Sequence, residues 1–184
     1  MRIIITGTPG TGKSVIAKRI YNFMKRLGIK YSMYEISEII EKYKHYNGLV
    51  VGYDSKRDSK IVDEEKLAKI LAQILKKNEN IIIVGHLSHY INPSYVDLVI
   101  VTKCKLKTLY NRLKRRGYSK NKIQENVEAE IFDICYNECL ERGFDKSQII
   151  ILHTDKNIIK SEWKRLEHAL TYFYRLRNKG HKES

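Results

Sequence analysis

The sequence predicts a three-layer α/β domain in which helices cover both faces of a five-stranded parallel sheet. Short apolar runs alternate along the chain with longer segments of helical periodicity. Two of the runs, Asn80–Val84 and Asp97–Thr102, are apolar almost throughout, as expected for parallel strands that are covered on both faces. The length of 184 residues suits a single domain. We therefore expect one domain, residues 1–184, with right-handed crossovers between its strands.

The first elements follow from a change of periodicity. Arg2–Ile5 is a short apolar run, and apolar residues recur at helical spacing from Lys13 until Gly28 ends the pattern. A second strand is expected over Lys30–Ile36 and a short helix over Ser37–Lys44.

An irregular stretch, NGLVVGYDSKRDSK, comes next, and the acids that start at Asp63 favour the first turn of another helix. After the two central strands the pattern predicts three helices, one loop and a last strand: helices over Leu106–Arg116, Ile123–Arg142 and Ile158–Leu176, a loop over Gly117–Lys122, and a strand over Gln148–His153. The final NKGHKES is expected to fray.

The first strand leads into GTPGTGKS, residues 7–14, which matches G-x-x-x-x-G-K-[ST] between a strand and a helix. Gly10 and Gly12 let the backbone approach phosphate closely, so that successive N–H groups converge on it at the helix N-terminus. The alternative is a glycine turn that only tightens the strand-to-helix junction. Strand, motif and amphipathic helix in register favour a P-loop that binds ATP or another nucleoside triphosphate.

Three residues at the start of this helix are candidates for binding the nucleotide. Lys13 is expected to reach the β and γ phosphates, and the Ser14 hydroxyl to bind Mg²⁺. Val15 adds a backbone N–H donor. The motif contacts phosphate and leaves the choice of base open.

The charge is strongly positive, with 35 Lys and Arg against 21 Asp and Glu and a net charge of +14. Nine basic residues and no acid occur over residues 98–124. The predicted partners are therefore anions, either a phosphate-rich ligand or nucleic acid. A solvated basic face and a compositional bias toward Lys and Ile are the plainer alternatives.

The three cysteines are an odd number, and no secretory signal precedes them, which predicts a cytoplasmic protein. Cys135 and Cys139 are four apart on an expected helix, so a metal site and a pair of buried thiols are both open. No apolar run approaches the ~20 residues of a membrane span, and no membrane partner is expected.

Three later stretches, GYDSKRDSKIVDEEKL, IIIVGHLSHY and RLKRRGYSKNKIQENVEAEI, follow the P-loop in order. Together with it they resemble the archaeal putative adenylate kinases and their eukaryotic nuclear relatives, over about residues 1–142. The resemblance implies a nucleoside monophosphate kinase type of P-loop fold, with a monophosphate-binding insertion over about residues 30–53 and a small lid over about residues 115–125.

The resemblance also implies an activity and partners. It implies Mg²⁺-dependent transfer from ATP to AMP or another nucleoside monophosphate, together with ATPase activity. It further implies a role in maturation of the small ribosomal subunit, with a small-subunit ribosomal protein and rRNA as partners.

The basic residues near the lid suit phosphoryl transfer. Two nucleotides bring up to four phosphates together, so the site needs cations beyond Lys13. Arg112 and Arg116 are four apart on an expected helix and share a face, so the pair could clamp the transferring oxygens. Arg116 matches the lid position of the family and is the first candidate.

The acceptor is expected at the stretch GYDSKRDSK, where Tyr53 would stack on the base and Arg57 would bind the monophosphate. An ordinary surface loop is the alternative.

The strand over residues 80–84 ends without the Asp that usually helps to hold Mg²⁺ in P-loop enzymes. The eukaryotic relatives carry Asp-x-His here, whereas this chain has Val84 at the Asp position and keeps only His86. Mg²⁺ is then expected to be held by Ser14, the phosphates and waters. His86 would orient a water or accept its proton. The alternatives are a histidine satisfied by hydrogen bonds and a zinc pair with His89.

Three functional hypotheses follow. The first is an ATP-dependent nucleoside monophosphate kinase. The second is a ribosome-assembly ATPase that contacts RNA, for which Tyr172, Phe173 and Tyr174 with nearby arginines could stack on bases, unless they are the packed side of a last helix. The third, a nucleotide-sensing module, would not need the basic lid.

Overall fold

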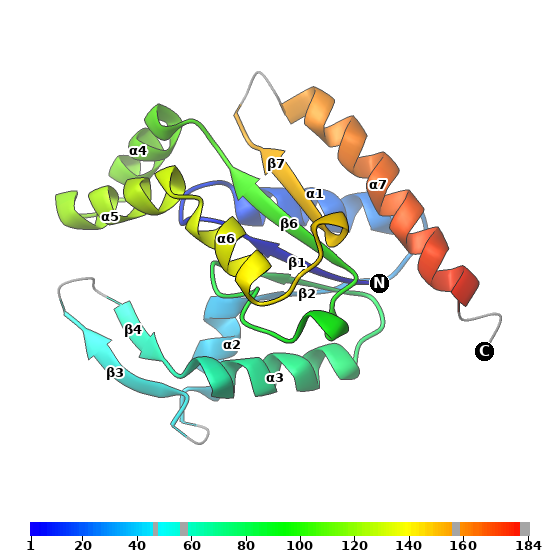
Figure 1. The fold of residues 1–184 in the computed structure, drawn as a ribbon, viewed down its shortest axis with the longest axis horizontal. Helices are drawn as coiled ribbons and strands as arrows, with labels where there is room; N and C mark the ends of the chain where they lie inside the picture. The colour runs from blue at the N-terminus through cyan, green and yellow to red at the C-terminus, as the bar shows by residue number, and fades with distance from the viewer. Residues whose placement is uncertain (46–47, 56–58, 156–158, 181–184) are drawn as a thin grey trace.

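The computed structural model describes residues 1–45, 48–55, 59–155 and 159–180. Its centre is a five-stranded parallel sheet of order β2-β5-β1-β6-β7, which confirms the predicted sheet (Figure 1). The strands are β1 (Arg2–Thr6), β2 (Ser32–Glu35), β5 (Ile81–Val84), β6 (Leu98–Lys103) and β7 (Ile149–His153). The P-loop sequence follows β1, and β1 is the central strand.

Helices cover both faces of the sheet, as predicted. On one face lie α1 (Lys13–Arg26) and α7 (Ile159–Gly180), and on the other α2 (Ile36–Tyr43), α3 (Glu64–Lys76) and α6 (Ile134–Glu141) (Figure 1). The pleat of β1 divides its side chains between these layers: Ile3 and Ile5 pack with α1 and α7, whereas Ile4 packs with α2 and α3. Each face is therefore a continuous apolar core.

Two helices lie beyond the carboxyl ends of the strands, α4 (Leu106–Arg115) and α5 (Lys120–Ile131) (Figure 1). They form a small core of their own around Leu109, Leu113 and Ile123. The short 3₁₀ helices η1 (Pro93–Tyr95) and η2 (Lys146–Gln148) lie in connections.

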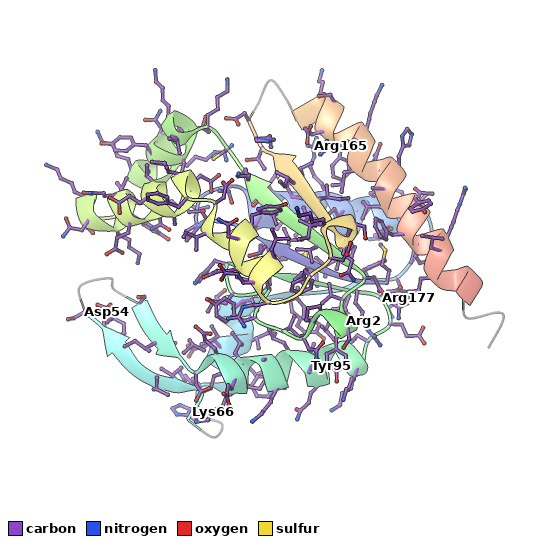
Figure 2. All side chains as sticks on the ribbon, viewed as in Figure 1. Arg2, Asp54, Lys66, Tyr95, Arg165 and Arg177 are labelled. Carbon is purple, nitrogen blue, oxygen red and sulfur yellow. The ribbon has the colours of Figure 1, made fainter. Side chains whose placement is uncertain are left out.

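The stretch that was predicted to be irregular contains an antiparallel hairpin, β3 (Val50–Asp54) and β4 (Ser59–Val62). It is not part of the main sheet, and Asp54 at the end of β3 lies far out on it (Figure 2). All five residues of β3 are half-buried or exposed, so the apolar alternation that identifies a strand from sequence is weak here.

The helix predicted over residues 123–142 is two helices. α5 starts earlier, at Lys120, where the Ser119 side chain accepts from the Lys122 N–H, and it ends at Ile131. α6 then starts after Asp133, whose φ of 53° is left-handed. An ion pair from Lys103 to Asp133 stabilises this break. Aspartate tolerates that conformation better than most residues, but its presence alone does not predict a break.

The last helix is held against the domain along its length. Phe173 and Tyr174 pack on the core, and the Arg177 guanidinium donates to Asp97 Oδ2 at 2.7 Å, beside Arg2 (Figure 2). Of the aromatic run only Tyr172, 60% exposed, faces solvent. Two of these three aromatic residues therefore belong to the side of the helix that packs against the domain. Within the described residues, no helix combines the length and apolar character that crossing a membrane requires.

Candidate functional site

The P-loop joins the central strand to α1 through glycines in left-handed conformations, with φ of 93° at Gly10 and 99° at Gly12. A Cβ at Gly10 would lie 2.9 Å from Leu109 Cδ1, so a larger residue would push α4 away from the loop. The loop thus fits closely against the helix that precedes the predicted lid. The sequence places glycine here because both the backbone and the packing require it.

Lys13 lies in the concave side of the loop. Its Nζ donates to the carbonyl oxygens of Gly7 at 2.7 Å and Thr8 at 3.0 Å. Burial lowers the pKa of Lys13 to about 8, and the nearby charge of Arg116 adds to the lowering. A bound phosphate would place a negative charge beside the Lys13 ammonium and so stabilise its protonated form.

A cleft of about 700 Å³ opens over the P-loop. Its floor is the loop and the carboxyl ends of β2 and β5, and its walls come from β4, from the connection between α4 and α5, and from α6. The cleft brings together seven residues predicted from sequence: Gly10, Gly12, Lys13, Ser14, Val15, His86 and Arg116. This volume is in the range of small-molecule sites.

Arg116 ends α4 and lines the cleft. Its guanidinium makes no hydrogen bond or ion pair with any residue that the structure describes. It is therefore a cation at the cleft wall whose donors are open to a ligand.

Arg112 does not line the cleft, so the structure does not bring the predicted arginine pair together there. Its guanidinium donates to the Gly10 carbonyl at 3.3 Å and to the Thr154 carbonyl and hydroxyl at 2.9 and 3.0 Å. These contacts tie α4 to the P-loop and to the end of β7. We therefore propose for Arg112 a positioning role.

The structure describes one of the two acceptor residues predicted from sequence. Tyr53 is 58% exposed on β3 and is not among the residues that line the cleft. Arg57 lies outside the described residues. The hairpin instead presents Ser59, Lys60 and Val62 to the cleft. No local sequence signal predicts these three contacts, because their position depends on the hairpin.

The two histidines differ in environment. His86 lines the cleft, and part of its surface is open to solvent. Removal from bulk water, with the charge of Lys13 next, lowers the pKa of His86 to about 4, so the ring is neutral at pH 7. His89 is fully buried, with Nδ1 2.7 Å from Thr6 Oγ1 and Nε2 2.8 Å from Glu138 Oε2.

His89 is thus the histidine that hydrogen bonds satisfy, and it links β1 to α6. A carboxylate only accepts, so His89 donates through Nε2. The described residues contain no group of three or more side chains suited to a metal ion, so neither a His86–His89 zinc site nor a Cys135–Cys139 site is supported by neighbouring ligands.

Replacing Glu138 by glutamine is expected to destabilise the fold by about 1 to 3 kcal/mol at pH 7, because a partly buried hydrogen bond to a charged group is weakened. The hydrogen bond from His89 lowers the pKa of Glu138 below its ordinary 4.5. The folded state then binds this proton less readily than the unfolded state, so the stabilisation is complete above about pH 4.5 and is lost as the pH falls through the lowered pKa.

Urea unfolding of both proteins from pH 7 to pH 3 measures this difference. The gap in unfolding free energy should shrink below about pH 4.5. Glu141→Gln, an exposed change of the same charge on α6, is the control. A gap that stays constant with pH would contradict the assigned role of the hydrogen bond.

The few oxygen ligands near the P-loop suit a metal ion that binds together with the triphosphate. Ser14 presents an exposed hydroxyl at the first turn of α1, in the cleft beside Lys13. β5 ends in Val84, which is buried and has no oxygen ligand in its side chain. Mg²⁺ usually keeps several waters and takes few protein ligands, so this site fits Mg²⁺ bound mainly by phosphates and waters.

Comparisons with known proteins give a consistent result. The model of the AAA domain family matches residues 3–133. A putative adenylate kinase of Methanocaldococcus jannaschii is 44% identical over 138 residues, 75% of this chain and 71% of the relative. An adenylate kinase isoenzyme 6 homologue of Saccharomyces cerevisiae is 36% identical over 153 residues, 83% of this chain and 73% of the relative.

Among solved structures, shikimate kinase from Bacteroides thetaiotaomicron superposes with a TM-score of 0.55 at 19% identity, covering 93% of this chain and 98% of that chain. At this identity the likeness concerns the fold. It confirms the predicted P-loop kinase architecture.

Proposed function

The chain belongs to the AAA domain family and to the family of putative adenylate kinases and adenylate kinase isoenzyme 6 homologues, and from this premise we propose that it is a nucleoside monophosphate kinase. It transfers the γ-phosphoryl group of Mg²⁺-bound ATP to AMP or another nucleoside monophosphate. The relatives whose names state adenylate kinase support AMP as the first acceptor to test.

The observation that carries this proposal is the convergence of cations from separate segments on one cleft. Lys13 comes from the P-loop, Lys60 from the hairpin, and Arg116 and Lys122 from the α4–α5 region. Donor and acceptor phosphates would meet between these walls. Catalysis would then consist of positioning and of neutralising charge on the transferring group.

Each part of the cleft has a task in this proposal. The loop N–H groups and Lys13 bind the β and γ phosphates, and Mg²⁺ supplies charge neutralisation when bound with them. Arg116 reaches the transferring group from the predicted lid, residues 115–125. Lid closure excludes water and limits hydrolysis. Tyr53, at the end of the predicted insertion over about residues 30–53, and Arg57 stay the predicted acceptor contacts.

The requirement for an acceptor tests the proposal directly. Adding a nucleoside monophosphate should raise ADP formation above the rate of hydrolysis alone, and the acceptor should become a diphosphate in an amount equal to that increase. Phosphate release at one rate with and without acceptor, with no diphosphate formed from the acceptor, would overturn the proposal.

ATP hydrolysis is a second candidate activity, favoured by the position of His86. A neutral imidazole in the cleft near Lys13 can accept a hydrogen bond from a water. With its low pKa it is a weak base, so it would orient the water more than deprotonate it.

Replacing His86 by alanine is therefore expected to lower ATP hydrolysis by about 10², while transfer to a monophosphate falls much less. Phosphate release without acceptor and ADP formation with AMP measure the two rates on one preparation. Equal losses in both reactions would contradict the role in hydrolysis.

The cellular role is a further part of the proposal. The net charge of +14 supports contact with rRNA or with a small-subunit ribosomal protein bound to it, in a cytoplasmic setting. In that case the nucleotide state of the cleft would alter the contact.

A further inference from the structure

The end of β5 carries no carboxylate, but the end of the neighbouring strand does. β2 pairs with β5 in parallel register, and its last residue, Glu35, is the partner of Val84. Adjacent strands lie ~4.8 Å apart, so Glu35 starts one strand spacing from the position where P-loop enzymes usually place their acid. Both residues line the cleft with Lys13 and Ser14.

Three carboxylates line the cleft, and two are engaged. Glu138 accepts from His89 through one oxygen and from Tyr90 through the other. Glu125 also takes part in an interaction. Glu35 is half-buried, yet it makes no hydrogen bond or ion pair with any of the described residues.

The Glu35 carboxylate is therefore available to a ligand that enters the cleft. Glu35 lines the same cleft as Lys13 and Ser14. Glu35 therefore faces the part of the cleft where the triphosphate and its ion would lie.

We propose that Glu35 supplies the carboxylate that Val84 cannot, and that it holds Mg²⁺ through a metal-bound water from β2 instead of β5. The proposal rests on the proposed nucleotide binding. Mg²⁺ commonly uses one or two carboxylates together with substrate phosphates and keeps several waters. Glutamate is one methylene longer than aspartate, which offsets part of the extra distance from the neighbouring strand.

Glu35→Gln keeps the shape of the side chain and removes its charge. The matched control is Glu38→Gln, three residues later on α2, where the side chain is exposed and does not line the cleft. The measurement is the affinity of Mn²⁺, a paramagnetic substitute for Mg²⁺, for the protein saturated with a non-hydrolysable ATP analogue, read from the electron paramagnetic resonance signal of free Mn²⁺.

Glu35→Gln is expected to weaken Mn²⁺ binding by about 10- to 100-fold, while Glu38→Gln binds like the unsubstituted chain. Affinity for the analogue without metal should be unchanged or tighter in Glu35→Gln, because a negative charge near the phosphates is gone. Equal Mn²⁺ affinities in Glu35→Gln and the unsubstituted chain would overturn the role of Glu35.

The metal-free measurement separates this inference from the proposed function. If the unsubstituted chain binds no analogue even without metal, the nucleotide site itself is wrong. If it binds the analogue and Mn²⁺ but Glu35→Gln changes neither, only the metal role fails.

Discussion

Arg116→Ala is expected to slow phosphoryl transfer by about 10³-fold or more, with ATP affinity nearly unchanged. Arg116 is a cation on the cleft wall whose guanidinium has no partner among the described residues. An arginine that neutralises the transferring group acts mainly in the transition state, so its loss lowers kcat more than it raises KM. Steady-state rates of ADP formation and calorimetric ATP binding measure the two effects.

The neighbouring arginines provide controls. Arg115 is exposed and does not line the cleft, so Arg115→Ala should retain its turnover. Arg112→Ala should instead lower thermal stability, because the carbonyls of Gly10 and Thr154 lose their donors. If Arg116→Ala turns over at the normal rate, the predicted lid does not deliver a cation to the transferring group.

Lys13→Ala is expected to lower both ATP affinity and turnover, with a loss of about 10² to 10³ in rate. Lys13 lies in the concave face of the loop and is held by the carbonyls of Gly7 and Thr8. The Lys13 ammonium would bind the phosphates of ATP in the ground state as well as in the transition state. The effect therefore differs from that of Arg116→Ala, because binding falls together with the rate.

Lys18→Ala is the matched control for this variant, since Lys18 is exposed on α1 and away from the cleft. Titration calorimetry with ATP and the initial rate of ADP formation give the comparison. ATP binding by Lys13→Ala at normal affinity would contradict the assignment of the loop as the phosphate site.

The parts of the molecule that the sequence predicted correctly depend on local signals. The P-loop is a contiguous motif whose glycines are required by their own backbone angles. Strands β1, β5 and β6 are buried on both faces, so their apolar runs stand out without knowledge of their neighbours. His86 and Arg116 could be placed because each follows closely on such a signal.

The parts that the sequence did not predict depend on packing between distant segments. Arg112 shares a helix face with Arg116 by spacing, but its contacts are to Thr154, which lies 42 residues away in the chain. At the break between α5 and α6, Asp133 forms an ion pair with Lys103, which lies 30 residues earlier in the chain. The position of Glu35 beside Val84 appears only when β2 is placed next to β5, since strand order cannot be read from periodicity.

Analysis of the nucleotide products tests the central claim most directly. The purified chain is incubated with Mg-ATP alone and with AMP, CMP, GMP or UMP, beside the Lys13→Ala variant. We expect the monophosphate to be converted to a diphosphate, with an equal amount of additional ADP formed from ATP, and only with Lys13 intact. Release of phosphate at one rate whatever acceptor is added, with no diphosphate formed from any acceptor, would contradict the kinase and leave an ATPase.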